Sequence, residues 1–138
     1  MTSESNKELV SRYFGEVING KMLNLIEDIF SNAYISHRMD GKQVHSVQDG
    51  SLISFLTYFF SAFPDIHYEI NNIIQEEDIV ALNLTATGTH NGEFLGYAAS
   101  QKKIQFKEMY FFRISNDRIV EGWGLPDVNG IREQISNQ

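Results

Sequence analysis

The stretch Ile79–Gly96, with the sequence IVALNLTATGTHNGEFLG, decides the fold of this chain. From Val80 onward, apolar or small residues alternate with polar ones, which is typical of a β-strand with one buried face. The same alternation places His90 on the apolar side, and Gly88 and Gly92 free the backbone where the strand ends. The pattern predicts a strand that forms one wall of a pocket and presents His90 at its end.

Segments with helical spacing precede this strand, and further alternating segments surround it. We expect helices over 5–20 and 23–30, followed by an extended piece over 33–38. A third helix should be capped by Ser46 or Asp49 and end before Pro64. Strands are expected over 66–76, 102–114 and 118–125, before a short terminal helix. Helices followed by a mostly antiparallel meander indicate an α+β fold. A curved sheet and three N-terminal helices would enclose an apolar pocket, within a single domain spanning 1–138.

Composition excludes several classes of function. The formal net charge of -7 argues against nucleic-acid binding, which depends on Lys and Arg neutralising phosphates. There is no cysteine, hence no disulfide, and the four histidines lack the spacing of a metal site, so we expect no metal. With no signal peptide and no apolar run long enough for a bilayer, we expect a cytoplasmic protein with no membrane partner.

Several short motifs occur together between Phe63 and Asp127. They are Phe63-Pro64-Asp65, then Gly88-Thr89-His90-Asn91-Gly92-Glu93-Phe94-Leu95-Gly96, Phe112-Arg113, and Ile119-Val120-Glu121-Gly122-Trp123 followed by Asp127. In this combination the chain resembles the SnoaL-like polyketide cyclases, which belong to the nuclear-transport-factor-2-like superfamily of cone-shaped domains. It departs from them at Tyr97-Ala98-Ala99-Ser100-Gln101 and at Gly122, where relatives often carry a larger polar side chain. These departures concern the shape of the pocket and therefore the substrate.

The resemblance implies a pocket that needs no cofactor, in which a buried aspartate is acid and base in an intramolecular aldol cyclisation of a polyketide ester. That aspartate falls on Asp127, with His90 assisting and Trp123 nearby. Burial among apolar groups would raise the pKa of Asp127 towards the value that such a base needs. Alternatively, Asp127 caps the terminal helix. His90 either polarises a carbonyl oxygen or bonds the local backbone.

Other side chains are candidates for binding the substrate. Glu108 shares its register with Tyr110, so it is either an inward functional carboxylate or the partner of a buried arginine. Tyr110 either donates a hydrogen bond to substrate or fills the core, and His37 lies either at the pocket mouth or on the surface. The aromatic wall is expected to comprise Phe14, Phe55, Phe59 and Trp123.

These residues support three hypotheses for function. The first is a polyketide cyclase-type enzyme acting on a small, flat, apolar carbonyl compound. The second is a non-catalytic domain that binds a small molecule or pairs subunits. The third is an isomerase, dehydratase or epoxide hydrolase on the same fold. We also expect a homodimer through the outward face of the sheet, which mixes polar and apolar residues: Asn83, Thr85, Thr87, Gln105, Met109 and Phe111.

Overall fold

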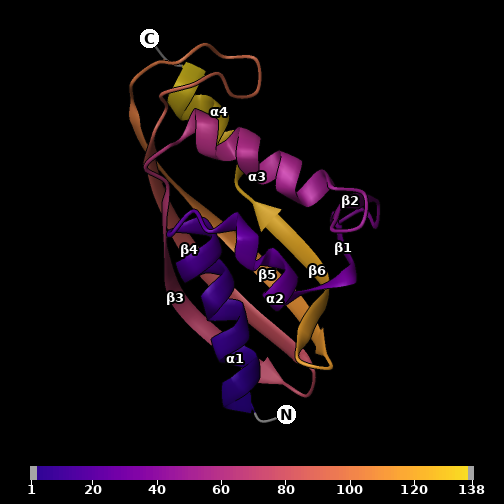
Figure 1. Cartoon of the computed structure of the whole chain (residues 1–138). Helices are drawn as coiled ribbons and strands as arrows, with labels where there is room; N and C mark the ends of the chain where they lie inside the picture. Colours follow the sequence, from indigo (N-terminus) through magenta and orange to yellow (C-terminus); the bar gives the residue numbers. More distant parts are fainter. Residues whose placement is uncertain (1–2, 137–138) are drawn as a thin grey trace.

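Helices cover one face of a single sheet in the computed structural model, which describes residues 3–136 (Figure 1). The helical elements are α1 (Ser3–Arg12), continued by a π-helical segment (Tyr13–Ile18), then a 3-10 turn (Leu23–Leu25), α2 (Ile26–Ile29), α3 (Ser51–Ala62) and α4 (Val128–Ser136). The N-cap residue of α3 is Gly50 rather than the predicted Ser46 or Asp49, although the Asp49 carboxylate accepts the Ser51 backbone N–H at 2.9 Å just before the helix.

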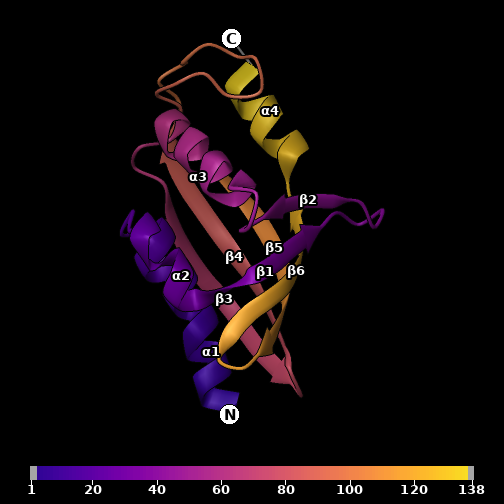
Figure 2. The ribbon, with the colours of Figure 1, turned by 45° about the vertical axis from the view of Figure 1, so that its right-hand side comes forward.

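The sheet has six strands in the order β2-β1-β6-β5-β4-β3. Their bounds are β1 (Phe30–His37), β2 (Gln43–Ser46), β3 (His67–Glu76), β4 (Ile79–Thr89), β5 (Lys103–Ser115) and β6 (Arg118–Pro126). β1 and β6 run parallel, whereas the other neighbours are antiparallel. Figure 2 shows β1 and β2 extending the sheet at the side of the last strand, β6. The predicted α+β class and mostly antiparallel curved sheet are confirmed.

Two local predictions differ from the structure in the segment between α2 and α3. The second helix ends at Ile29, because Phe30 is already extended and pairs with Ile119 of β6. Residues 43–46, which we did not predict as a strand, form β2 by pairing with β1. Pairing with a neighbouring strand therefore outweighs local preference here.

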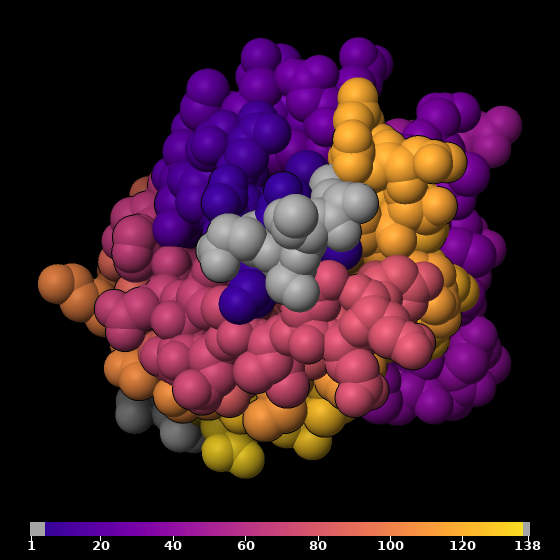
Figure 3. Space-filling view, turned by 90° about the horizontal axis from the view of Figure 1, so that it is seen from below, coloured from indigo at the N-terminus to yellow at the C-terminus, as the bar shows by residue number. Residues whose placement is uncertain are grey.

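The core lies between the helices and the concave face of the sheet. In β4, the residues predicted to face inwards are buried: Val80, Leu82, Leu84 and Ala86. Figure 3 shows the molecule from the end that carries the β3–β4 turn. In this view α1 (indigo) lies between the middle of the chain (pink) and β6 (orange). Among residues 3–136, no helix is long and apolar enough to cross a membrane.

Candidate active site

A cavity of about 620 Å³ lies between the concave face of the sheet and the helices. Side chains from the π-helical segment, β1, β2, α3, β5, β6, the 91–101 loop and α4 line it, and most of them are apolar. Five large apolar side chains that line the cavity are also exposed and lie at its opening: Met39, Val44, Leu95, Leu125 and Val128. The predicted apolar pocket is thus present, with a defined mouth.

Glu108 is the one acidic side chain that is buried in the wall of this cavity, among the residues that the structure describes. It lies on β5 with only 5% of its surface exposed, and its Oε1 accepts a hydrogen bond from the Tyr110 hydroxyl at 2.8 Å. Burial raises the pKa of Glu108 from 4.5 to about 7, although hydrogen bonds from Tyr110 and Tyr68 oppose the shift. A carboxyl group with this pKa can both accept and return a proton at neutral pH.

Four tyrosines line the cavity with this carboxyl group: Tyr68 and Tyr110 hydrogen-bond to it, Tyr13 interacts with its charge, and Tyr34 lies beside Tyr13. Burial raises the pKa of each hydroxyl, so all four remain protonated and act as hydrogen-bond donors at neutral pH. Tyr13 begins the π-helical segment, a distortion that is frequent at functional sites. No group among residues 3–136 hydrogen-bonds to its hydroxyl, which leaves that donor free for a ligand.

Glycine at position 122 makes room for one of these phenols. A Cβ atom there would lie 2.6 Å from the Tyr34 hydroxyl and 3.1 Å from the Phe112 ring. The Tyr34 hydroxyl and the Phe112 ring therefore occupy the space that a larger side chain at position 122 would need.

Asp127 lies outside the cavity wall and is exposed. Its Oδ1 accepts the Gly130 backbone N–H at 2.9 Å, and its carbonyl oxygen accepts the Ile131 N–H at 3.1 Å. The prediction that this carboxylate is enclosed in the pocket is wrong, because β6 ends at Pro126 and the next residue turns to cap α4. The alternative prediction of a helix cap is confirmed.

His90 is fully buried but does not line the cavity. Its Nδ1 accepts the Ser100 backbone N–H at 3.2 Å and lies 2.8 Å from the Ser100 hydroxyl, so the ring proton belongs on Nε2. The backbone N–H of His90 donates to the carbonyl oxygen of Lys102 at 2.9 Å, and the carbonyl oxygen of His90 accepts the Gln101 backbone N–H at 2.8 Å. Burial also lowers the pKa of His90. The predicted place at the pocket is wrong, and the predicted bonding to local backbone is confirmed: His90 anchors the 91–101 loop.

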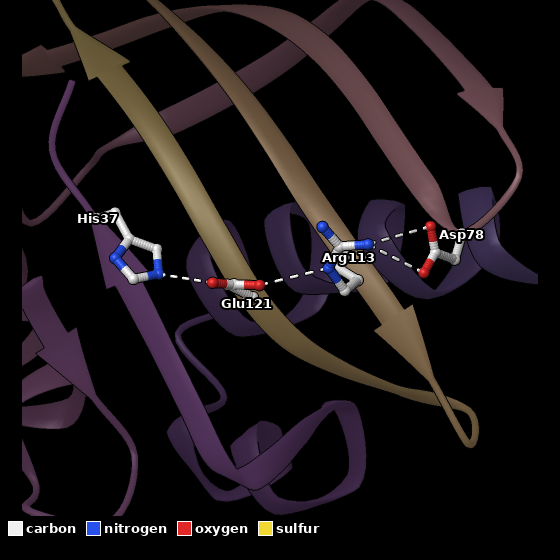
Figure 4. A network of polar contacts seen from close by, with 4 residues as sticks. All are labelled: His37, Asp78, Arg113 and Glu121. Carbon is white, nitrogen blue, oxygen red and sulfur yellow. Dashed lines mark hydrogen bonds and ion pairs between the residues drawn. The ribbon is translucent and has the colours of Figure 1, made fainter. Parts of the chain in front are cut away.

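His37 belongs to a polar network across the sheet (Figure 4), and the Trp123 ring packs against His37 and Arg113 of this network. His37 Nε2 lies 2.8 Å from a Glu121 oxygen, Arg113 Nε donates to the other Glu121 oxygen at 3.3 Å, and an Arg113 amino group lies 3.1 Å from Asp78. The His37 ring stacks on Trp123, with ring centroids 5.5 Å apart. His37 touches the cavity rim, but Trp123 does not line the cavity, so its predicted place in the aromatic wall is wrong.

The rest of the predicted wall is partly correct. Phe55 and Phe59 line the cavity and stack on each other, with centroids 5.7 Å apart. Phe14 lies behind the wall, against Tyr68 and Tyr110, because its position on the π-helical segment points it into the core.

Several lining residues with polar groups were not predicted from the sequence, among them Tyr13, Tyr34, Tyr68 and His45. Tyr68 could have been found, because it shares the inward register of Ile66 and Ile70. His45 lies on the unpredicted strand β2, so no pattern indicated its direction. No three His, Asp or Glu side chains come together as a possible metal site within residues 3–136.

Comparison with known proteins identifies the family. A family model described as SnoaL-like polyketide cyclase matches residues 8–135. The chain belongs to this family. A search of curated proteins found no match.

Solved structures share the fold of this SnoaL-like chain over nearly its whole length. AclR, a putative hydroxylase from Streptomyces galilaeus, is 24% identical with a TM-score of 0.88, and the match covers 98% of both chains. A putative SnoaL-like polyketide cyclase from Jannaschia sp. is 21% identical with a TM-score of 0.88, over 99% of this chain and 94% of that one. IdmH, a putative polyketide cyclase from Streptomyces antibioticus, is 19% identical with a TM-score of 0.82, over 96% and 99%. The nuclear-transport-factor-2-like fold is therefore confirmed.

Proposed function

We propose that this SnoaL-like protein is an enzyme of the polyketide cyclase type that moves a proton next to a carbonyl group, with Glu108 as the acid and base. One observation carries the proposal: a carboxyl group with a pKa of about 7 is buried in the wall of an apolar cavity and surrounded by phenols. Asp127, the position that the family resemblance favoured, is exposed and engaged as a helix cap.

The proposed chemistry needs only proton transfer and formation of one carbon–carbon bond. Ionised Glu108 removes a proton from the carbon beside a carbonyl, and the enolate oxygen accepts hydrogen bonds from phenols, first from the free hydroxyl of Tyr13. The enolate carbon then attacks a second carbonyl of the same molecule, whose oxygen takes up one proton while Glu108 releases one. No electrons are gained or lost, and the proposed reaction uses no cofactor.

The side chains that line the cavity indicate the class of substrate. A cavity of about 620 Å³ lined by Phe55 and Phe59 suits a flat, apolar ligand with few polar groups. Acetylnaphthalene is a suitable probe, because its methyl protons exchange with solvent deuterium only through the enol. The protein should accelerate this exchange, followed by NMR, whereas binding without exchange would favour the non-catalytic alternative.

Replacing Asp127 by alanine should show whether this residue caps α4 or takes part in catalysis. We expect a loss of about 1 kcal/mol in the free energy of unfolding, because the N–H of Gly130 loses its acceptor. The exchange rate at a temperature where the variant is folded should stay within about twofold of the parent rate. Asp127→Asn, which keeps a capping side chain, should recover the stability; a large loss of exchange in this variant would restore the catalytic role.

The outer face of the sheet supports a homodimer. Cross-strand register places Ile74, Ala81, Phe111 and Trp123 in one row, and Met109 and Leu125 in the row beside it. Ile74, Met109, Phe111 and Leu125 are each more than half exposed, which is unusual for large apolar side chains in one patch.

Phe111→Lys should therefore shift the protein from dimer to monomer in light scattering, while the circular dichroism spectrum stays unchanged. Ile53→Lys, at an exposed position of α3 outside the sheet, is the matched control and should remain dimeric. A monomeric parent protein would exclude the dimer.

A further inference from the structure

The cavity holds a second polar group that the proposed proton transfer does not use. His45 lies on β2, lines the cavity and stacks on Phe55 with ring centroids 4.8 Å apart and an interplanar angle of 26°. Its backbone N–H donates to the Ser36 hydroxyl at 3.0 Å, which fixes this part of β2 against β1. Among residues 3–136, no group hydrogen-bonds to either nitrogen of the ring.

The His45 ring is a neutral donor and acceptor. Burial lowers its pKa, and the charge of Asp49 opposes this shift only in part. A neutral imidazole offers one N–H donor and one acceptor nitrogen. Because neither ring nitrogen is paired within residues 3–136, a ligand that presents an oxygen to the ring gains a hydrogen bond.

His45 and Glu108 lie on different walls of the cavity. The strands β1 and β6 separate β2 from β5, which amounts to three strand spacings, or roughly 14 Å along the sheet. Polar lining groups continue from Tyr34 through Ser36 towards His45, whereas Phe55 and Phe59 form the apolar side. A ligand that reaches both walls therefore has polar groups at its two ends and a flat apolar body between them.

We infer that His45 is a specificity-determining residue that recognises a second oxygen of the substrate, remote from the carbon at which Glu108 acts. This inference rests on the proposed function, because Glu108 defines the reacting end. The remote group is a hydroxyl or carbonyl oxygen on the far ring of a planar compound, which accepts the imidazole N–H while the ring lies beside Phe55. His45 acts here through binding and takes no part in the proton transfer.

Two ligands that differ by one oxygen test the inference. They are acetylnaphthalene and its analogue with a hydroxyl group on the ring remote from the acetyl group, with affinities measured by calorimetry. Wild-type protein should bind the hydroxylated compound about tenfold more tightly, as expected for one added hydrogen bond. His45→Phe keeps a ring on Phe55 but removes both nitrogens, so it should abolish the preference for the hydroxylated compound. His45→Gln should keep part of the preference.

Controls separate this inference from the proposed function. His67→Phe replaces an exposed histidine on β3 and should keep the full preference. Glu108→Gln should also keep the preference, although it loses proton exchange. Absence of exchange in wild-type protein would overturn the proposed function while the tenfold preference could stand. A wild-type protein that binds neither ligand or both equally, or a His45→Phe variant that keeps the preference, would overturn the role of His45.

Discussion

Glu108→Gln lowers the rate of α-proton exchange in acetylnaphthalene by about 10³-fold, the expected loss when a positioned general base is removed. The amide keeps the shape of the side chain and still accepts the Tyr110 hydrogen bond, so ligand affinity should change little. In the parent protein, the exchange rate should rise with pH around pH 7, because the ionised form of Glu108 is the base. This inflection should disappear in the variant. NMR of the methyl signal in deuterated buffer measures both effects.

The same substitution should stabilise the protein in alkaline solution. Burial raises the pKa of Glu108 in the folded state above its ordinary value of 4.5, so the unfolded chain releases the proton first as pH rises. The stability of the parent protein should therefore fall between pH 4.5 and about 7, by roughly 3 kcal/mol in total. Glutamine cannot ionise, so the variant should unfold at a higher denaturant concentration at pH 8, and this advantage should vanish below pH 4.5.

Glu69→Gln is the matched control for both measurements, since Glu69 is exposed on β3. It should leave the exchange rate and its pH dependence unchanged. Equal exchange rates in the parent and Glu108→Gln would contradict the assignment of the base, and equal stabilities of the two proteins at pH 8 would contradict the buried, ionising carboxyl.

Gly92→Ala should destabilise the fold strongly, because an added Cβ atom would collide with the backbone of α3. An added Cβ would lie 2.4 Å from the carbonyl oxygen of Ser61 and 3.2 Å from the Cα of Ala62, both of which are backbone atoms of α3. The backbone N–H groups of Asn91 and Gly92 both donate to the Ala62 carbonyl oxygen, at 2.9 and 3.1 Å, so the loop cannot move away without losing them. We expect a loss of about 3 kcal/mol and a melting temperature lower by roughly 10 °C in calorimetry.

Gly15→Ala provides the control for this substitution. Gly15 lies in the π-helical segment, and nothing lies within 4 Å of an added Cβ. This variant should be as stable as the parent or slightly more stable, because alanine favours helical structure. If Gly92→Ala were no less stable than Gly15→Ala, the close packing of the 91–101 loop on α3 would be wrong.

The strand pattern of the sequence predicted the walls of the cavity well. Period-two alternation identified β4 and placed Glu108 and Tyr110 on one face of β5, where the structure has them. Alternation is reliable here because a shift of one residue would turn every apolar side chain of the strand towards solvent. The sequence could therefore indicate an inward carboxylate, but the phenols beside it come from separate elements and required the fold.

Asp127 and His90 show where the sequence was ambiguous. An aspartate after a strand and before a helix fits both an inward acid and a helix cap, and only the turn after Pro126 distinguishes them. His90 follows the inward parity of β4, but it lies beyond the last residue of that strand and bonds with Ser100 instead. Several residues of the family motif therefore stabilise the structure. His90 anchors the 91–101 loop, and Arg113 and Glu121 link neighbouring strands of the sheet (Figure 4).

The carboxyl group of Glu108 is buried and exchanges its proton near neutral pH. NMR titration of protein labelled with ¹³C at the glutamate carboxyl carbon measures this directly, with the Glu108 signal assigned by its absence in Glu108→Gln. One glutamate should titrate with a pKa of about 7. A Glu108 signal that titrates at the ordinary value of 4.5 would contradict it.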